Sequence, residues 1–150
     1  MYMSTRKQWP LRAVVSVLLA VVVLGCGTSA EPAAEQRVDL VLRDFAIDPH
    51  RSVVPPGLTE FDAFNEGPTV HELILVRTDR GADALPLQAD GLTAVEEAPD
   101  VEFMVADEGI DLDERGGFRA VLTPGHYVLY CNLEGHYLGE MYADLDVQES

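Results

Sequence analysis

The sequence has few positive charges and none of the common nucleotide-binding motifs. It holds 10 lysines and arginines against 26 aspartates and glutamates in 150 residues, a net charge of −16 at pH 7. This balance argues against nucleic acid as a partner, because phosphate binding needs a cationic surface. There is no P-loop, no glycine fingerprint of a dinucleotide-binding fold and no zinc-protease helix motif, which leaves those activities without support. The length allows one domain and hardly two.

Long apolar runs are also scarce, and the clearest one lies near the N-terminus. Residues 13–24 are apolar except for Ser16. A membrane-spanning helix needs about 20 such residues, whereas a run of this length is typical of the core of a signal peptide. We therefore expect residues 1–25 to be a signal peptide, with an uncleaved signal anchor as the alternative. Three cations precede the run: Arg6, Lys7 and Arg12.

The end of this run carries a lipoprotein signature. Val23-Leu24-Gly25-Cys26 resembles the lipobox of prokaryotic lipoproteins, in which the cysteine receives a diacylglycerol and becomes the new N-terminus. The resemblance implies an exported protein held at the cell membrane through Cys26, facing the periplasm or the cell exterior. Residues 26–36 are expected to form a flexible tether, and residues 37–150 the folded domain.

Removing the signal peptide makes the chain still more acidic. Residues 26–150 keep seven arginines, no lysine and all 26 acids, which is a net charge of −19. Such a surface repels anionic lipids and nucleic acid and favours partner proteins with a cationic docking surface. Solubility alone is the alternative explanation of the acidity.

Cysteine is scarce, and its use is informative. The chain has two cysteines, and if Cys26 carries lipid, Cys131 has no partner within the chain. Exported proteins normally pair their cysteines, so an unpaired thiol indicates a metal-binding or reactive role. A Cys26–Cys131 disulfide stays open as the alternative.

From residue 37 onward, apolar and polar residues alternate with the period of a β-strand. Turn signals such as Pro55-Pro56-Gly57 and Thr123-Pro124-Gly125 separate the runs, which predicts an all-β antiparallel β-sandwich with one buried face per strand. Residues 77–100, rich in Asp, Gly, Ala and Pro, are expected to form a variable excursion with a short helix at 92–97. The expected strands lie at 38–43, 59–64, 71–76, 101–105, 118–122, 126–131 and 141–147.

Candidate metal ligands gather near the C-terminus. Cys131, His136 and Met141 are spaced with four residues between neighbours and lie between two expected strands. A thiolate, an imidazole and a thioether, joined by a second imidazole, form the ligand set that selects copper, with two His and one Cys around a weak axial Met. His71 fits as the second imidazole, because it follows a turn and begins a strand.

These residues occur in two patterns that resemble those of the cupredoxins, the blue-copper family. The spacing around His136 is similar to that of rusticyanin and auracyanin. Many members have Gly directly before the Met, whereas this chain has Glu140. The matching residues are Asn65, Gly67, His71 and Glu72 upstream, and Pro124-Gly125, Tyr130-Cys131, Gly135-His136-Tyr137 and Met141 downstream.

The resemblance implies a Greek-key β-sandwich that binds one type 1 copper ion and carries single electrons between redox partner proteins. Its metal ligands would be His71, Cys131, His136 and Met141, and it would have no catalytic residue. Backbone N–H groups near Asn65 and after Cys131 would hydrogen-bond the sulfur. The edge of His136 would be the electron port, within an apolar patch expected at Leu133, Tyr137, Leu138 and Pro68.

Other functions compete with an electron carrier. A copper carrier or delivery protein is one, although such proteins tend to expose Met- and His-rich clusters, and only Met104 and Met141 follow the signal peptide. A metal-free cupredoxin-like interaction domain is another, and the complete ligand set argues against it. A hydrolase that uses Cys131 and His136 is a further alternative, but the sequence suggests neither a partner acid nor a substrate cleft for it. Multicopper enzymes need more domains than this length provides.

Overall fold

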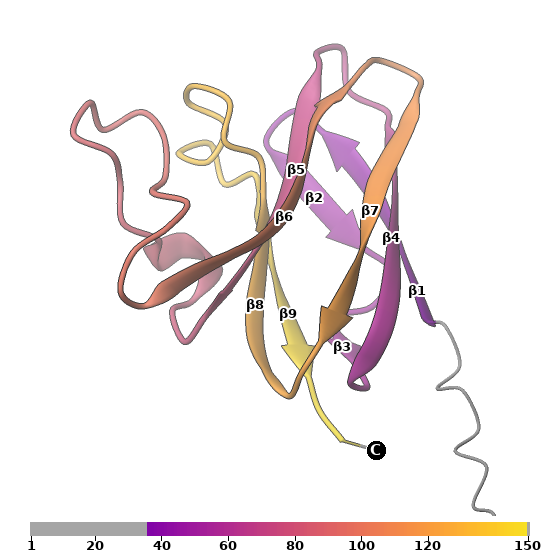
Figure 1. The fold of residues 1–150 in the computed structure, drawn as a ribbon. Helices are drawn as coiled ribbons and strands as arrows, with labels where there is room; N and C mark the ends of the chain where they lie inside the picture. The colour runs from indigo at the N-terminus through magenta and orange to yellow at the C-terminus, as the bar shows by residue number, and fades with distance from the viewer. Residues whose placement is uncertain (1–35, 150) are drawn as a thin grey trace, which may run out of the picture.

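Two β-sheets face each other in the computed structural model, which describes residues 36–149 (Figure 1). Cys26, the expected signal peptide and nearly all of the expected tether lie outside the described residues, so these assignments stay predictions. No helix among residues 36–149 has the length and apolar character needed to cross a membrane.

The first sheet has four strands, and the chain enters it directly from the expected tether. The strands lie in the order β2-β1-β4-β7. Their bounds are Gln36–Arg43 for β1, Ala46–Pro49 for β2, Gly57–Asn65 for β4 and Arg115–Leu122 for β7.

The second sheet has five strands and carries the segments that flank the candidate metal ligands. Its order is β3-β9-β8-β5-β6. The bounds are Val53–Val54 for β3, His71–Thr78 for β5, Val101–Ile110 for β6, Gly125–Tyr130 for β8 and Tyr142–Val147 for β9.

The main apolar core lies between the two sheets, and the period-two pattern identified most of it. The inward rows expected at 38–42, 59–63 and 71–75 are buried, as are Leu145 and Val147 in the last strand. Each strand of this kind places alternate side chains on one face, so a single row can fill the space between two sheets. The predicted all-β sandwich is therefore confirmed.

The prediction of purely antiparallel sheets is wrong in two places. β1 pairs with β4 in parallel, and β3 pairs with β9 in parallel. The cause is the passage of the chain through β2 and β3, which belong to different sheets, before β4 returns beside β1. These two strands have only four and two residues, too few to show a period in the sequence.

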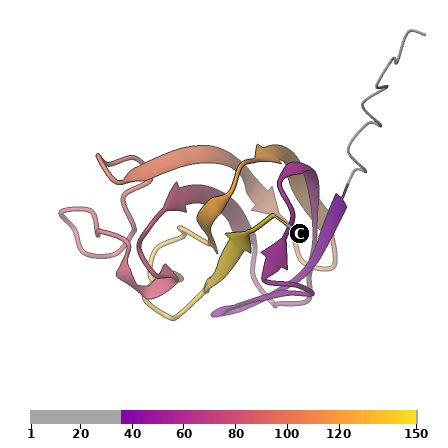
Figure 2. The same cartoon turned by 90° about the horizontal axis from the view of Figure 1, so that it is seen from below.

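The excursion after β5 is ordered and covers the outer face of the five-stranded sheet. Figures 1 and 2 show it on the side away from the four-stranded sheet. The helix expected at 92–97 is absent; a 3-10 helix at Ala82–Ala84 is present instead. The carbonyl of Leu92, which a helix would offer to the N–H of residue 96, accepts the N–H of Gly135 instead, and Ala94 forms an antiparallel bridge with Leu87, so no helix forms there. Its apolar residues form a second cluster with the sheet, including Ile74, Val76, Ala82, Leu85, Ala94, Val128, Tyr130 and Tyr137.

Candidate metal centre

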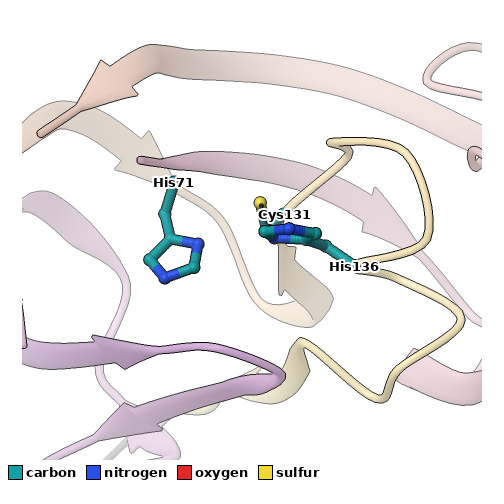
Figure 3. Close-up of side chains that lie close together, drawn as sticks. All are labelled: His71, Cys131 and His136. Carbon is teal, nitrogen blue, oxygen red and sulfur yellow. Dashed lines mark hydrogen bonds between the residues drawn. The ribbon is translucent and has the colours of Figure 1, made fainter. Parts of the chain in front are cut away.

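Three of the predicted ligands come together at one end of the sandwich. The ligand atoms of His71, Cys131 and His136 all lie within 4.8 Å of one another. Figure 3 shows the side chains of Cys131 and His136 beside each other, with a ring nitrogen of His71 turned toward both. Cys131 Sγ and His136 Nδ1 are 3.4 Å apart, and the two imidazole rings meet edge to face with their centroids 5.2 Å apart.

His71 is fully buried at the start of β5; its Nδ1 has no hydrogen-bond partner, and its Nε2 lies 3.2 Å from the Asp44 carboxylate without the alignment of a regular hydrogen bond. The turn before it is held by Asn65, whose side-chain amide donates to the carbonyls of Thr69 (2.8 Å) and Ile110 (2.9 Å). The Asn65 side-chain oxygen accepts the N–H of Gly67 at 2.8 Å. Buried polar atoms are normally paired, so the unpartnered Nδ1 of a rigidly held imidazole indicates a missing partner such as a metal ion.

Cys131 is fully buried directly after β8 and has its own hydrogen-bond donor. The backbone N–H of Glu72 points to Cys131 Sγ at 3.3 Å. The expected donor after Cys131 is present as the N–H of Leu133. The expected sulfur donor near Asn65 is not found, because the N–H groups of Asn65, Glu66 and Gly67 all bond to oxygens. The donor instead lies on the strand residue after His71, so one strand supplies both an imidazole and a hydrogen bond to the thiol.

The loop 131–141 is closed at its base by backbone hydrogen bonds. The N–H of Cys131 bonds to the carbonyl of Met141, and the N–H of Met141 bonds to the carbonyl of His136, both at 3.1 Å. Met141 is fully buried in the apolar cluster that also holds Cys131. Glu140 has φ = 74°, in the left-handed region that favours glycine. This explains why Gly suits the place before the Met, and the Glu140 side chain is exposed to solvent.

The excursion supports this loop from outside. The Asn132 side chain is bonded to the backbone N–H and carbonyl of Ala94, at 2.7 and 3.1 Å. The buried Tyr137 hydroxyl donates to the carbonyl of Ala82 at 2.7 Å and accepts the N–H of Leu85 at 2.9 Å. A segment that composition identified only as variable therefore fixes the conformation of the ligand loop.

The protonation of the cluster suits metal binding. Burial lowers the pKa of His71, the neighbouring His136 lowers it further, and the Asp44 carboxylate opposes both effects. A neutral imidazole has a free lone pair, which is the form that binds a metal. Burial raises the pKa of the Cys131 thiol, while the N–H groups of Glu72 and Leu133 lower it. The donor set fits copper, and the thiol proton would leave when the metal binds.

The apolar patch expected around His136 is only partly present. Leu138 and Pro68 are exposed, whereas Leu133 is half-buried against the main core and Tyr137 is buried under the excursion. Phe45 was not predicted; its ring is 52% exposed and lies 5.7 Å from the His136 ring, centroid to centroid. The turn between β1 and β2 presents it, and nothing in the sequence places that turn beside the loop 131–141.

Comparison by sequence finds no match for this chain, whereas comparison by structure finds proteins of the same fold. No protein-family model and no curated protein matches the chain. Among solved structures, dithionite-reduced auracyanin from the photosynthetic bacterium Roseiflexus castenholzii matches with a TM-score of 0.58 and 18% identity, covering 77% of this chain and 98% of that one. Auracyanin B matches with a TM-score of 0.53 and 22% identity, over 79% and 91% of the two chains.

Rusticyanin is similar to the same extent. Its reduced form matches with a TM-score of 0.54 and 16% identity, covering 77% of this chain and 81% of that one. At such identities the likeness is one of fold, and the ligand cluster has to be judged from this chain's own geometry. The chain therefore has the cupredoxin fold of the auracyanins and rusticyanin, with a His-Cys-His cluster that fits a type 1 copper site.

Proposed function

We propose that this protein is a type 1 copper protein that carries single electrons between redox partners outside the cytoplasm. One observation carries the proposal: a buried thiol and two imidazoles converge within 4.8 Å, and the Nδ1 of the buried His71 has no hydrogen-bond partner. His71, Cys131 and His136 would hold the ion, with Met141 as the weak axial ligand. When bound, copper would accept and release one electron by changing between its two oxidation states.

The chain's own residues would limit rearrangement during that exchange. Asn65 holds the turn before His71, and the Asn132 and Tyr137 side chains tie the ligand loop to the excursion. Because the donors are held in place by these bonds, little reorganisation should accompany a change of charge at the site. The Glu72 N–H would stabilise the thiolate of Cys131, as hydrogen bonds around a metal site do.

The proposed partners are redox proteins with cationic docking surfaces. Residues 26–150 carry a net charge of −19. Six arginines of the described region lie within 4.0 Å of a carboxylate, so their positive charge is locally offset. A field of one sign steers oppositely charged partners toward the surface. The apolar residues Phe45 and Leu138 beside His136 would then make the close contact.

The proposed location is a membrane surface, with the domain tethered through lipidated Cys26. Figure 1 supports this arrangement: β1 begins at one end of the sandwich, and the loop 131–141 lies at the other. A tether at the first end would leave the candidate site facing away from the membrane. A diacylglycerol supplies two acyl chains, enough for stable anchoring, whereas one chain binds only marginally.

Copper binding is the first prediction. One equivalent of Cu(II) should give the intense visible absorption of thiolate-to-copper charge transfer. At free copper 100 times its dissociation constant, the unfolding free energy should rise by about 2.7 kcal/mol. Cys131→Ser and His71→Gln should lose the absorption, while His50→Gln, an exposed histidine, should keep it. Copper binding without this absorption would favour a copper carrier, and no binding would favour a metal-free interaction domain.

The axial ligand is tested by changing the buried Met141 and its exposed neighbour. An oxygen donor stabilises Cu(II) and a missing donor favours Cu(I), so Met141→Gln should lower the reduction potential and Met141→Leu should raise it. Both variants should keep copper, because three ligands remain. Glu140→Gln serves as the control and should move the potential only slightly. Protein-film voltammetry gives the potentials, and a dominant effect of Glu140→Gln would identify the carboxylate as the axial ligand instead.

Partner charge is tested with small redox complexes of opposite sign. The oxidation rate of the reduced protein by a trivalent cobalt cation should fall as salt shortens the Debye length from about 30 Å at 0.01 M to 10 Å at 0.1 M. The rate with the ferricyanide anion should rise over the same range. Both oxidation rates are measured by stopped-flow spectroscopy. If neither rate depends on salt, the acidic surface does not steer partners, and solubility would explain the acidity.

The lipid anchor is tested through the two cysteines. In a bacterial host, the wild-type protein should partition into the detergent phase and carry the mass of a diacylglycerol on Cys26. Cys26→Ala should lose that mass, whereas Cys131→Ser, which removes the other thiol, should retain it. Wild-type protein found wholly in the aqueous phase with an unmodified Cys26 would contradict the anchor.

A further inference from the structure

The turn between β1 and β2 brings a carboxylate to the candidate metal centre. Asp44 Oδ1 lies 3.2 Å from His71 Nε2, and the Asp44 side chain is 31% exposed while His71 is buried. The contact lacks the alignment of a regular hydrogen bond, and Nε2 has no other polar partner. Asp44 belongs to neither cupredoxin-like pattern, because it precedes His71 by 27 residues on a different strand pair.

The surroundings hold the carboxylate in this position. The Thr69 hydroxyl donates to the same Asp44 oxygen at 2.8 Å. Gly67 leaves the space that the contact needs, since a Cβ there would lie 2.7 Å from His71 Nε2 and 3.0 Å from Asp44 Oδ1. The backbone of Gly67 is itself fixed by the Asn65 side chain. Three residues of one turn thus shape the approach of Asp44 to His71.

The next residue of the turn contacts the other histidine. Phe45 has φ = 65°, which is unusual for a bulky side chain and indicates a conformation held by its surroundings. Its ring packs beside His136 and against Gly139, where a Cβ would lie 2.1 Å from the ring. Asp44 is therefore presented by a turn that is anchored on the ligand loop.

The position of a carboxylate decides which imidazole nitrogen keeps the proton. A neutral imidazole has one N–H and one lone pair, and an adjacent acceptor favours the proton on the nitrogen that faces it. Asp44 lies beside Nε2, and Figure 3 shows the other side of the His71 ring turned toward Cys131 and His136. A carboxylate behind a ligating histidine also raises the basicity of that ligand.

We propose that Asp44 is a positioning residue of the metal centre: it keeps the His71 proton on Nε2, so that the Nδ1 lone pair faces Cys131 and His136. Its charge, placed behind a ligand, stabilises the more highly charged oxidised copper. The second statement rests on the proposed copper function, whereas the first concerns the metal-free protein and is tested without copper.

The tautomer is measured in the metal-free protein from the nitrogen-15 shifts of the His71 ring, at a pH where the ring is neutral. The wild type should show the Nε2–H tautomer alone, and Asp44→Ala should show a mixture with Nδ1–H. Thr69→Val should shift the tautomer in the same direction, whereas Thr69→Ser, which keeps the hydroxyl, should not. A wild-type Nδ1–H tautomer, or one unchanged in folded Asp44→Ala, would overturn the positioning role.

The electrostatic effect is measured in the copper-loaded protein. Asp44→Asn keeps the size of the side chain and an oxygen for Thr69, so it should fold and should raise the reduction potential. Asp48→Asn removes an equal charge from the same hairpin, where Asp48 pairs with Arg43, and should change the potential less. Equal shifts in the two variants would show a general charge effect and overturn the role of the contact.

The two proposals fail in different ways. If the wild type binds no copper but shows the Nε2–H tautomer dependent on Asp44, the copper function is wrong and the positioning role stands. If copper binds with its visible absorption but the His71 tautomer is the same in Asp44→Ala as in the wild type, the positioning role is wrong and the copper function stands. Gly67→Ala adds a check on the contact itself, because its Cβ should separate Asp44 from His71 and reproduce the tautomer mixture of Asp44→Ala.

Discussion

A fully buried imidazole whose Nδ1 has no hydrogen-bond partner is the feature on which the architecture of this site depends. A buried and unpaired polar group costs roughly 1–3 kcal/mol, and burial leaves the Nδ1 of His71 in that condition, while its Nε2 faces the Asp44 carboxylate. Such a side chain would turn or draw in water if its surroundings allowed it. The rigid turn from Asn65 to Thr69 and the start of β5 prevent this, so the fold maintains a strained polar arrangement that a metal ion would relieve.

The fold also holds the thiol of Cys131 and the imidazole of His136 in place. Cys131 ends one strand, and Met141 stands directly before its antiparallel neighbour, so the ladder between β8 and β9 fixes both ends of the ligand loop. Within that loop the backbone turns tightly enough to force Glu140 into a left-handed conformation. Strain of this kind persists only when surrounding contacts outweigh it, and here a closed ring of backbone hydrogen bonds and the packing of Met141 supply them.

Much of this arrangement was predictable from local sequence. Alternating apolar residues located seven of the nine strands within residues 36–149. These strands could be predicted because their period is a property of neighbouring residues. The closeness of His71 to Cys131 and His136 followed from the resemblance to the cupredoxin patterns and is present in the structure, whereas Met141 as a fourth ligand stays a prediction.

What the sequence did not reveal depends on contacts between distant segments. Asp44 and Phe45 lie in the turn before β2, a strand too short to show a period, so their closeness to the two histidines is a result of sheet pairing. The parallel pairs arise because the chain changes sheets between β2 and β3. The helix expected at 92–97 does not form because the carbonyl of Leu92 accepts the N–H of the distant Gly135 and Ala94 pairs with Leu87.

The bonds between the excursion and the ligand loop have a consequence for how this domain can vary. Surface segments rich in small and polar residues usually accept insertions freely. Here the backbone of Ala94 is matched to the Asn132 side chain, and the carbonyl of Leu92 receives the N–H of Gly135, beside the candidate ligand His136. A change of length between these points would be transmitted directly into the loop that holds three candidate ligands. The excursion thus supports the ligand loop from outside, and the bonds to Leu92 and Ala94 constrain the length of this part of it.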